Sequence, residues 1–187
     1  AGQSRRYRGL IFHRRSQIME DPYVLAVPEA LDLGGVVDPE RELPAAKVRM
    51  LRQSIHFAFG STHARHVSEW YDRLVPGHRP VAQCRSFDTA LSLVRAGTGV
   101  CIAPALATVG AAGVGDRIRR YRIEVPPRRI VVLLLSQNRA LEPMATLIAG
   151  LREAGRTHRL PELLPTPPFL AGDPGPDLQM PPGAGND

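Results

Sequence analysis

Hydroxyl side chains stand at two points where a helix is expected to begin directly after a strand. The first point is the GST stretch with Ser61 and Thr62, and the second is the RSF stretch with Ser86 and Phe87. A helix N-terminus leaves backbone N–H groups unpaired and carries a partial positive charge, so it attracts anions as well as N-cap hydroxyls. The side chains at both points are therefore candidates for plain helix capping or for contact with a carboxylate, and the Phe87 ring could cover an aromatic or aliphatic body.

Two other groups of residues could do chemistry, but each has a simpler interpretation. His63, His66 and Glu69 lie close together on one expected helix, yet histidines three residues apart without a further ligand pattern do not predict a metal site. Ser61, His63 and Asp72 are the residue types of a nucleophilic triad, without the local sequence of a nucleophile elbow. We therefore expect no catalytic residue, no metal and no cofactor.

Two further motifs favour a structural role over a cofactor. Cys84 and Cys101 have no CxxC partner and lie in apolar, strand-like runs, which is typical of buried free thiols. The GTG motif at Gly97 to Gly99 follows a helical stripe instead of preceding one, so it does not match a dinucleotide fingerprint.

Composition indicates a folded, basic, cytoplasmic chain. Of its 187 residues 43% are hydrophobic and 22% charged, which suits one α/β domain or two small lobes. The net charge is +6, but Lys47 is the single lysine among 24 basic residues and the arginines are scattered, which favours a solvated basic surface over direct nucleic-acid binding. No apolar run approaches the roughly 20 residues that span a bilayer, and no signal peptide is visible, so no membrane partner is expected.

The middle of the chain alternates between strand and helix periodicity. Strands are predicted at 55–59, 80–84 and 99–103, and helical stripes lie between them at Val67, Trp70, Tyr71, Leu74 and at Phe87, Ala90, Leu91, Val94. Ser86 is placed to N-cap the second helix, and Gly97 is placed to end it in a left-handed conformation. Such alternation with short turns predicts a parallel sheet covered by helices.

Strand and helix patterns also flank this middle region. A strand is predicted at 23–28, followed by a turn, and a further strand at 130–136 precedes a helix at about 142–154. Residues 161–187 hold eight of the 18 prolines and no Lys or Arg, which predicts a disordered tail.

The order of these pieces is similar to a known family. The segment FDTALSLVRAGTGVCIAPALA resembles the helix, glycine pair and apolar strand of LysR-type transcriptional regulators. LIFHRRSQIMEDPYVLAVPEALDL, FAFGSTHARHVSEWYDRL and RIVVLLLSQNRALEPMATLIAGLREA resemble further pieces of that family's effector domain, in the same order. The resemblance covers roughly residues 9–155, and it rests on the joint order because no single motif is highly specific.

The resemblance implies an α/β fold of two lobes, like that of periplasmic binding proteins, with mainly parallel sheets and a Pro-rich tail. We expect residues 1–54 to form a remnant of the first lobe and the crossover, 55–118 the second lobe, 119–158 the return to the first lobe, and 159–187 the tail. The first lobe is expected to be incomplete, with the chain a fragment or a truncated relative. Glu29 and Ala30 replace a His-Pro pair common in the family.

The function implied by the resemblance is effector sensing by a transcriptional regulator. A small anionic or aromatic metabolite would bind between the lobes, with Ser61, Thr62, Ser86, Phe87 and Pro28 as the candidate contacts. The full-length protein would be a homo-oligomer, dimer or tetramer, and would contact DNA only through a helix-turn-helix domain absent here. The alternatives are a small cytoplasmic α/β enzyme that uses the histidine group, or a non-functional truncated paralogue.

Overall fold

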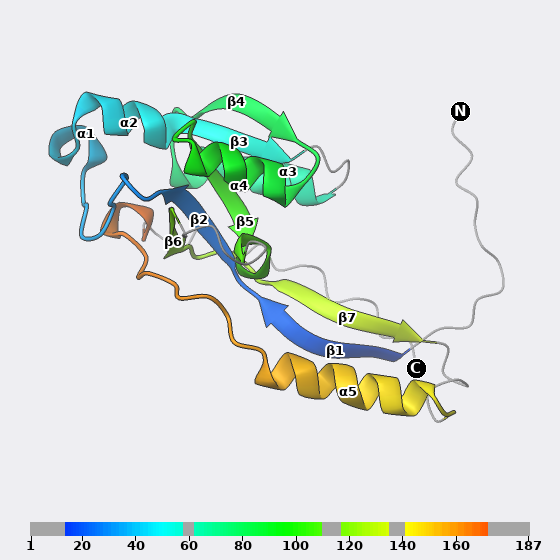
Figure 1. Cartoon of the computed structure of the whole chain (residues 1–187). Coiled ribbons are helices and arrows are strands. Elements are labelled where there is room, and N and C mark those ends of the chain that lie inside the picture. The colour runs from blue at the N-terminus through cyan, green and yellow to red at the C-terminus, as the bar shows by residue number, and fades with distance from the viewer. Residues whose placement is uncertain (1–13, 58–61, 110–116, 135–140, 172–187) are drawn as a thin grey trace, which may run out of the picture. The chain divides into compact units, whose positions relative to one another are not determined.

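The computed structural model of the chain describes residues 14–57, 62–109, 117–134 and 141–171 (Figure 1). The chain divides into two compact units, and each is described by itself below. Unit 1 consists of residues 1–21 and 127–160, and unit 2 of residues 22–126 and 161–187. The sequence pattern instead predicts boundaries after residues 54, 118 and 158.

Unit 1 is built from two strands and one helix within the described residues. Strands β1 (Arg14–Asp21) and β7 (Arg128–Leu134) pair antiparallel, and helix α5 (Met144–Thr157) packs on β1. Gly155 permits this close packing, because a Cβ at that position would come within 2.6 Å of the Ile18 carbonyl oxygen. The predicted strand at 130–136 and the helix at 142–154 are thus confirmed, apart from residues 135–136, which lie outside the described residues.

Unit 2 holds the remaining elements around one five-stranded sheet. They are β2 (Tyr23–Pro28), α1 (Pro39–Glu42), α2 (Ala45–Arg52), β3 (Gln53–Phe57), α3 (Thr62–Leu74), β4 (Arg79–Cys84), α4 (Phe87–Arg95), β5 (Val100–Pro104), η1 (Ala105–Thr108), β6 (Ile118–Arg122) and η3 (Pro168–Leu170). The strand order is β4-β3-β5-β2-β6.

The pairing in unit 2 is mixed. β3 is parallel to β4 and β5, as the alternating pattern predicts, but β2 is antiparallel to both β5 and β6. With the antiparallel β1–β7 pair, the described sheets are therefore mixed where mainly parallel ones were expected. The α/β class holds, and the difference arises because strand direction is set by how the chain returns, which a local apolar pattern does not encode.

Helices α3 and α4 cover opposite faces of this sheet (Figure 1). On β5, Val100 and Ile102 belong to the apolar core under α3, while Cys101 and Ala103 belong to the core under α4. This alternation follows from the two-residue period of a strand. Both predicted helical stripes are confirmed as the buried faces, since α3 contributes Val67, Trp70, Tyr71 and Leu74 and α4 contributes Ala90, Leu91 and Val94.

The two glycines after α4 have different tasks. Gly97 has a φ of 77°, the left-handed conformation that ends the helix. Gly99 lies so close to Gln53 that a Cβ would overlap the Gln53 backbone carbonyl. The first glycine therefore turns the chain, and the second lets β5 enter beside β3.

The segment from Pro161 to Ala171, which we call the strap, corrects the expectation of disorder for this part of the tail. Leu164 forms a parallel bridge with Tyr121, through hydrogen bonds from Leu164 N to Arg120 O of 2.8 Å and from Arg122 N to Leu164 O of 3.0 Å. Leu170 is only 2% exposed in the core of unit 2. The prediction of disorder was wrong for this segment because three apolar side chains, Leu164, Phe169 and Leu170, and one bridge hold it against the existing core. Residues 172–187 lie outside the described residues.

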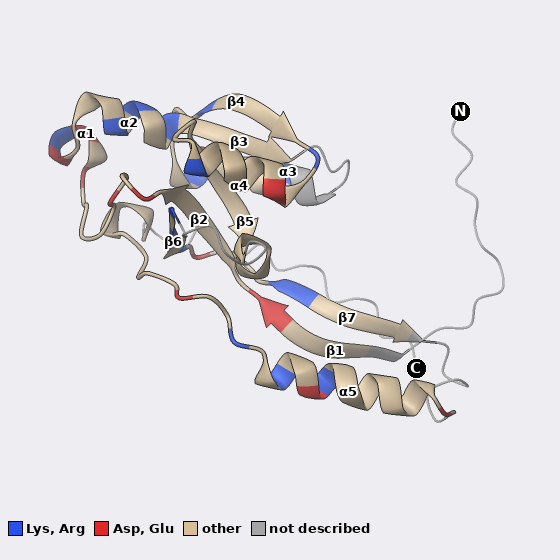
Figure 2. Ribbon diagram, viewed as in Figure 1, with Lys and Arg blue, Asp and Glu red and all other residues tan. Residues whose placement is uncertain are grey.

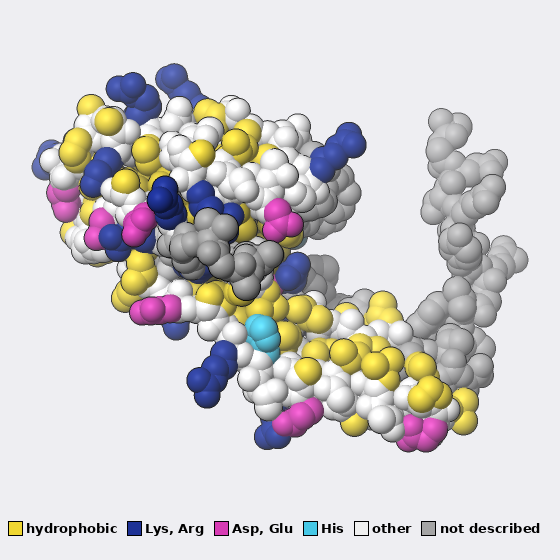
Figure 3. All heavy atoms as spheres, in the orientation of Figure 1, with side chains coloured by type: hydrophobic (Ala, Val, Ile, Leu, Met, Phe, Trp, Pro, Cys, Tyr) yellow, Lys and Arg dark blue, Asp and Glu magenta, His cyan; other side chains and the backbone are white. Residues whose placement is uncertain are grey.

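Charge on unit 2 is unevenly distributed. Lys and Arg gather on α2 and around the start of β4 (Figure 2), and their side chains stand out from the surface there (Figure 3). In the described part of the chain, no helix is both long enough and apolar enough to span a membrane.

Candidate functional site

The C-terminal ends of the parallel strands of unit 2 lie at one edge of its sheet. β3 ends at Phe57, β4 at Cys84 and β5 at Pro104, and α3 and α4 begin next to this edge. Beyond the last β3–β5 pair the two strands separate around the buried Tyr71 hydroxyl, which donates to Ile55 O at 3.0 Å and accepts from Ile102 N at 2.8 Å. The C-terminal edge of parallel strands, beside helix N-termini, is the usual ligand position in α/β folds.

Ser86 is the N-cap of α4, as predicted. Its extended backbone (φ −139°, ψ 151°) precedes the helix, and its Oγ accepts a hydrogen bond from Thr89 N at 3.2 Å. The same oxygen lies 2.9 Å from Thr89 Oγ1. The hydroxyl thus already performs the structural role, while the first turn still directs the positive end of the helix dipole toward this edge.

Phe87 is partly a core side chain. Its ring centroid lies 4.4 Å from that of Phe57, with the rings inclined by 57°, and it packs against the apolar core under α4. The ring is half-buried. Phe87 therefore anchors the start of α4, and its remaining surface faces solvent beside Ser86.

The GST stretch is placed only in part. Thr62 is the first residue of α3, so its backbone lies at the same edge as the start of α4. Ser61 lies outside the described residues.

Pro28 lies at the opposite edge of the sheet. β2 runs antiparallel to β5, so Tyr23 pairs with Pro104 at the candidate edge, and Pro28 at the far end of β2 pairs with Ile118. The chain passes from unit 1 to unit 2 between residues 21 and 22, not at Pro28. Pro28 therefore lies at the end of a strand inside unit 2, away from the edge where α3 and α4 begin.

A chain of hydrogen-bonded polar side chains, not predicted from the sequence, runs from the exposed Asp72 on α3 to the buried Ser54 and the half-buried His56 on β3. Asp72 Oδ1 lies 3.1 Å from His78 Nε2, Ser54 Oγ lies 2.8 Å from His78 Nδ1, and His56 Nε2 lies 2.9 Å from Ser54 Oγ. All three hydrogen bonds can form at once if His56 donates to Ser54, Ser54 donates to His78, and His78 donates to Asp72. The sequence shows Ser54 and His56 two residues apart, but it does not show that His78 lies beside them.

Ser54, His78 and Asp72 are linked in the order of a hydrolytic triad, but the serine is not accessible to a substrate. Ser54 is 0% exposed, and its hydroxyl is enclosed by two imidazoles, so no substrate reaches it. Burial lowers the pKa of His56, and the nearby His78 lowers it further. Asp72 is engaged with His78, and His63, the other histidine considered with it, lies outside the residues whose side chains are described.

The other candidate for metal chemistry has a simple structural role. His66 stacks on Trp70 with a centroid distance of 6.2 Å. Among the described residues, no cluster of three or more His, Cys, Asp or Glu side chains could hold a metal ion.

Cys101 is expected to be unreactive in the folded protein. Burial raises the pKa of its thiol to about 12, and the neighbouring Cys84 adds to this shift. The thiolate is the reactive form, so at pH 7.5 a Cys84→Ser variant should show no labelling of Cys101 by a disulfide reagent until the chain is unfolded in guanidinium. Stoichiometric labelling of the native variant within minutes would contradict the burial of this thiol.

The model of the LysR substrate binding domain family matches residues 13–156, close to the roughly 9–155 on which the resemblance rests. No curated protein matches the chain.

Solved structures share the fold at low sequence identity. The regulatory domain of Synechocystis PCC6803 CcmR in complex with 2-PG is 15% identical with a TM-score of 0.57, and the match covers 82% of this chain and 69% of that one. The reduced regulatory domain of OxyR from Pseudomonas aeruginosa is 15% identical with a TM-score of 0.52, covering 79% and 68%. Full-length CbnR in complex with its target DNA is 16% identical with a TM-score of 0.50, covering 80% of this chain and 49% of CbnR.

Proposed function

Because the chain belongs to the LysR substrate binding domain family, whose members are effector-binding domains of transcriptional regulators and not enzymes, we propose that its ligand is a small anionic metabolite bound at the candidate edge of unit 2. The proposed contacts on this unit are the start of α4, with Ser86 and Phe87, and the start of α3, with Ser61 and Thr62. Pro28 is left out, because it lies at the opposite edge.

One observation carries this proposal. Ser86 begins α4 directly after parallel strand β4, so a capped helix N-terminus faces the edge where β3 and β5 separate. An anion there would gain from the first-turn N–H groups and from the helix dipole. The half-buried Phe87 ring would favour a ligand with an aromatic or aliphatic part.

Control of transcription requires the whole regulator. In the proposed mechanism, the effector binds one arrangement of the protein more tightly than another and so shifts their populations. DNA would be bound by a helix-turn-helix domain outside this chain, in a cytoplasmic dimer or tetramer. The DNA complex of CbnR supports this division of tasks, because this chain spans only about half of that protein.

Ser86→Ala is expected to weaken effector binding at least fivefold. The change removes a hydroxyl from the edge and also the N-cap, which costs about 1 kcal/mol of stability. The measurement is a calorimetric titration of the full-length regulator with 2-PG, the ligand of the CcmR complex, and with benzoate as an aromatic carboxylate.

Two matched variants separate binding from capping. Ser86→Thr keeps the hydroxyl and the cap, and should retain most of the affinity. Ser92→Ala removes an exposed hydroxyl from the same helix, one that donates to Asp88 O at 2.8 Å, and should leave binding unchanged. If the effector binds the wild type and Ser86→Ala equally well, Ser86 does not contact it.

A further inference from the structure

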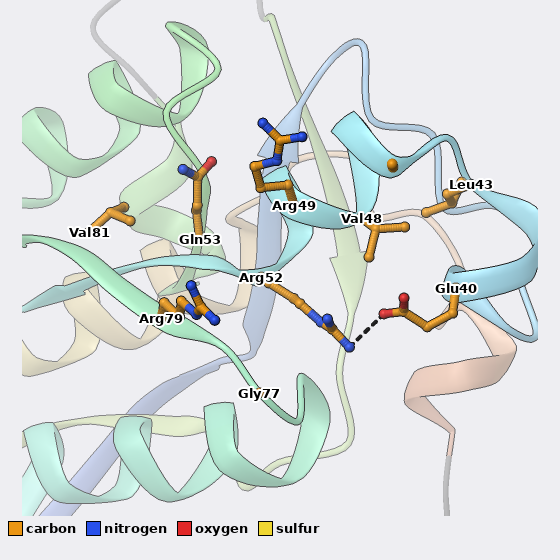
Figure 4. Close-up of a pocket in the computed structure, with 10 residues that line it drawn as sticks. Glu40, Leu43, Val48, Arg49, Arg52, Gln53, Gly77, Arg79 and Val81 are labelled. Carbon is orange, nitrogen blue, oxygen red and sulfur yellow. Dashed lines mark ion pairs between the residues drawn. The ribbon is translucent and has the colours of Figure 1, made fainter.

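A cavity lies at the edge of the sheet of unit 2 opposite to the candidate edge. Its volume is about 600 Å³, and it opens between α2 and the start of edge strand β4 (Figure 4). Gln53 and Arg79 pair at the first positions of β3 and β4, which places the cavity at the N-terminal ends of these strands. The proposed effector edge lies at their C-terminal ends, so the two sites are different.

The charge of the cavity lining is strongly positive. Arg49, Arg52 and Arg79 line it from α2 and β4, and Glu40 of α1 is the one acidic residue in the lining. Glu40 forms an ion pair with Arg52 at 2.6 Å, drawn as the dashed line in Figure 4. Three guanidinium groups against one carboxylate leave two positive charges uncompensated within the lining.

The helix dipole explains only part of this arrangement. Arg49 and Arg52 lie in the last turn of α2, where cations are favoured whatever the function. Arg79 begins an edge strand and gains nothing from that dipole, yet it lines the same space. In the described part of the chain, neither Arg49 nor Arg79 has an ion-pair partner, so both guanidinium groups are available to pair with an anion from outside.

The rest of the lining suits a hydrocarbon body. Leu43, Val48 and Val81 also line the cavity, and Val81 is 42% exposed on β4. Arg79 and Val81 both line the cavity, so one ligand could meet both. Guanidinium groups pair with carboxylates and phosphates through two parallel hydrogen bonds, which a chloride ion does not offer.

We propose that this cavity binds a small organic anion with at least two negative groups, such as a polycarboxylate or an organic phosphate. The anion bridges Arg79 on the sheet edge and Arg49 on α2. Glu40 competes with it for Arg52, so the site is tuned by a carboxylate of the chain itself.

The test is calorimetric titration of the protein with citrate and with pyrophosphate at low ionic strength. The wild type is compared with the double variant Arg49→Gln/Arg79→Gln, with Glu40→Gln, and with Arg122→Gln as a control. Arg122 is exposed on β6, outside the cavity lining. Circular dichroism establishes that each variant is folded before titration.

We expect the double variant to bind at least tenfold more weakly, Glu40→Gln to bind severalfold more tightly, and Arg122→Gln to match the wild type. Stronger binding of citrate would assign a carboxylate ligand, and stronger binding of pyrophosphate a phosphate ligand. The proposal is overturned if neither anion binds, or if Arg122→Gln loses as much affinity as the double variant, which would indicate a diffuse basic surface. An unchanged affinity of Glu40→Gln would remove Arg52 from the site.

Discussion

Replacing Gly99 with alanine is expected to lower the free energy of unfolding of unit 2 by about 3 kcal/mol, because the new Cβ would overlap the backbone of Gln53. The obstacle is a carbonyl group held in β3, not the end of a flexible side chain. Relief would require β5 to move away from β3, where the two strands are joined only by the pairs Ser54–Val100 and Ile55–Cys101.

Urea unfolding followed by tryptophan fluorescence measures this loss. Trp70 is the single tryptophan and is 8% exposed in the core under α3, so it reports on unit 2. Ser92→Ala is the matched control, because it shortens an exposed side chain on α4 of the same unit and should change the stability of unit 2 by less than about 0.5 kcal/mol. A Gly99→Ala variant as stable as the wild type would mean that the turn before β5 does not lie against β3.

Leu170→Ala is expected to destabilise unit 2 by about 3 kcal/mol, the usual cost of removing a fully buried leucine side chain. Leu170 is 2% exposed and belongs to the same core as Trp70, although it lies in the proline-rich strap. Truncation after Leu160 should cost at least as much, because it also removes the bridge to Tyr121.

Leu160→Ala serves as the control for the strap. Leu160 is 38% exposed just before the strap, so its loss should cost well under 1 kcal/mol. The same fluorescence measurement applies to all three variants. Equal stability of Leu170→Ala and wild type would mean that the strap does not contribute to the core of unit 2.

Local patterns determined the elements around the candidate edge. The apolar stripe from Ala90 to Val94, the cap at Ser86 and the glycine at Gly97 each depend on neighbours within a few residues, so periodicity and residue type were sufficient. The family was also accessible from the order of such pieces, and the match to residues 13–156 agrees with it.

Tertiary structure alone decided which of these pieces meet. Pro28 lies at the opposite edge because β2 runs antiparallel to β5, and the local sequence of a strand does not indicate its direction in the sheet. Gly99 was predicted to begin the strand 99–103 after the helix end at Gly97, but its close approach to Gln53 was not predicted, because that contact joins residues far apart in the chain. The strap was expected to be disordered because its composition does not reveal that Leu170 packs into the apolar core formed by the rest of unit 2.

The candidate edge could be predicted from the sequence, whereas the polar chain and the cavity could not. By itself the sequence determined that hydroxyls and a helix N-terminus follow strand β4, because capping is a short-range hydrogen bond. It did not reveal the polar chain from Asp72 to His56, or the cavity that Arg49 and Arg79 share. Both depend on the pairing of β3 with β4. Such pairing is decided by the burial of the whole core, which no single segment of the sequence specifies.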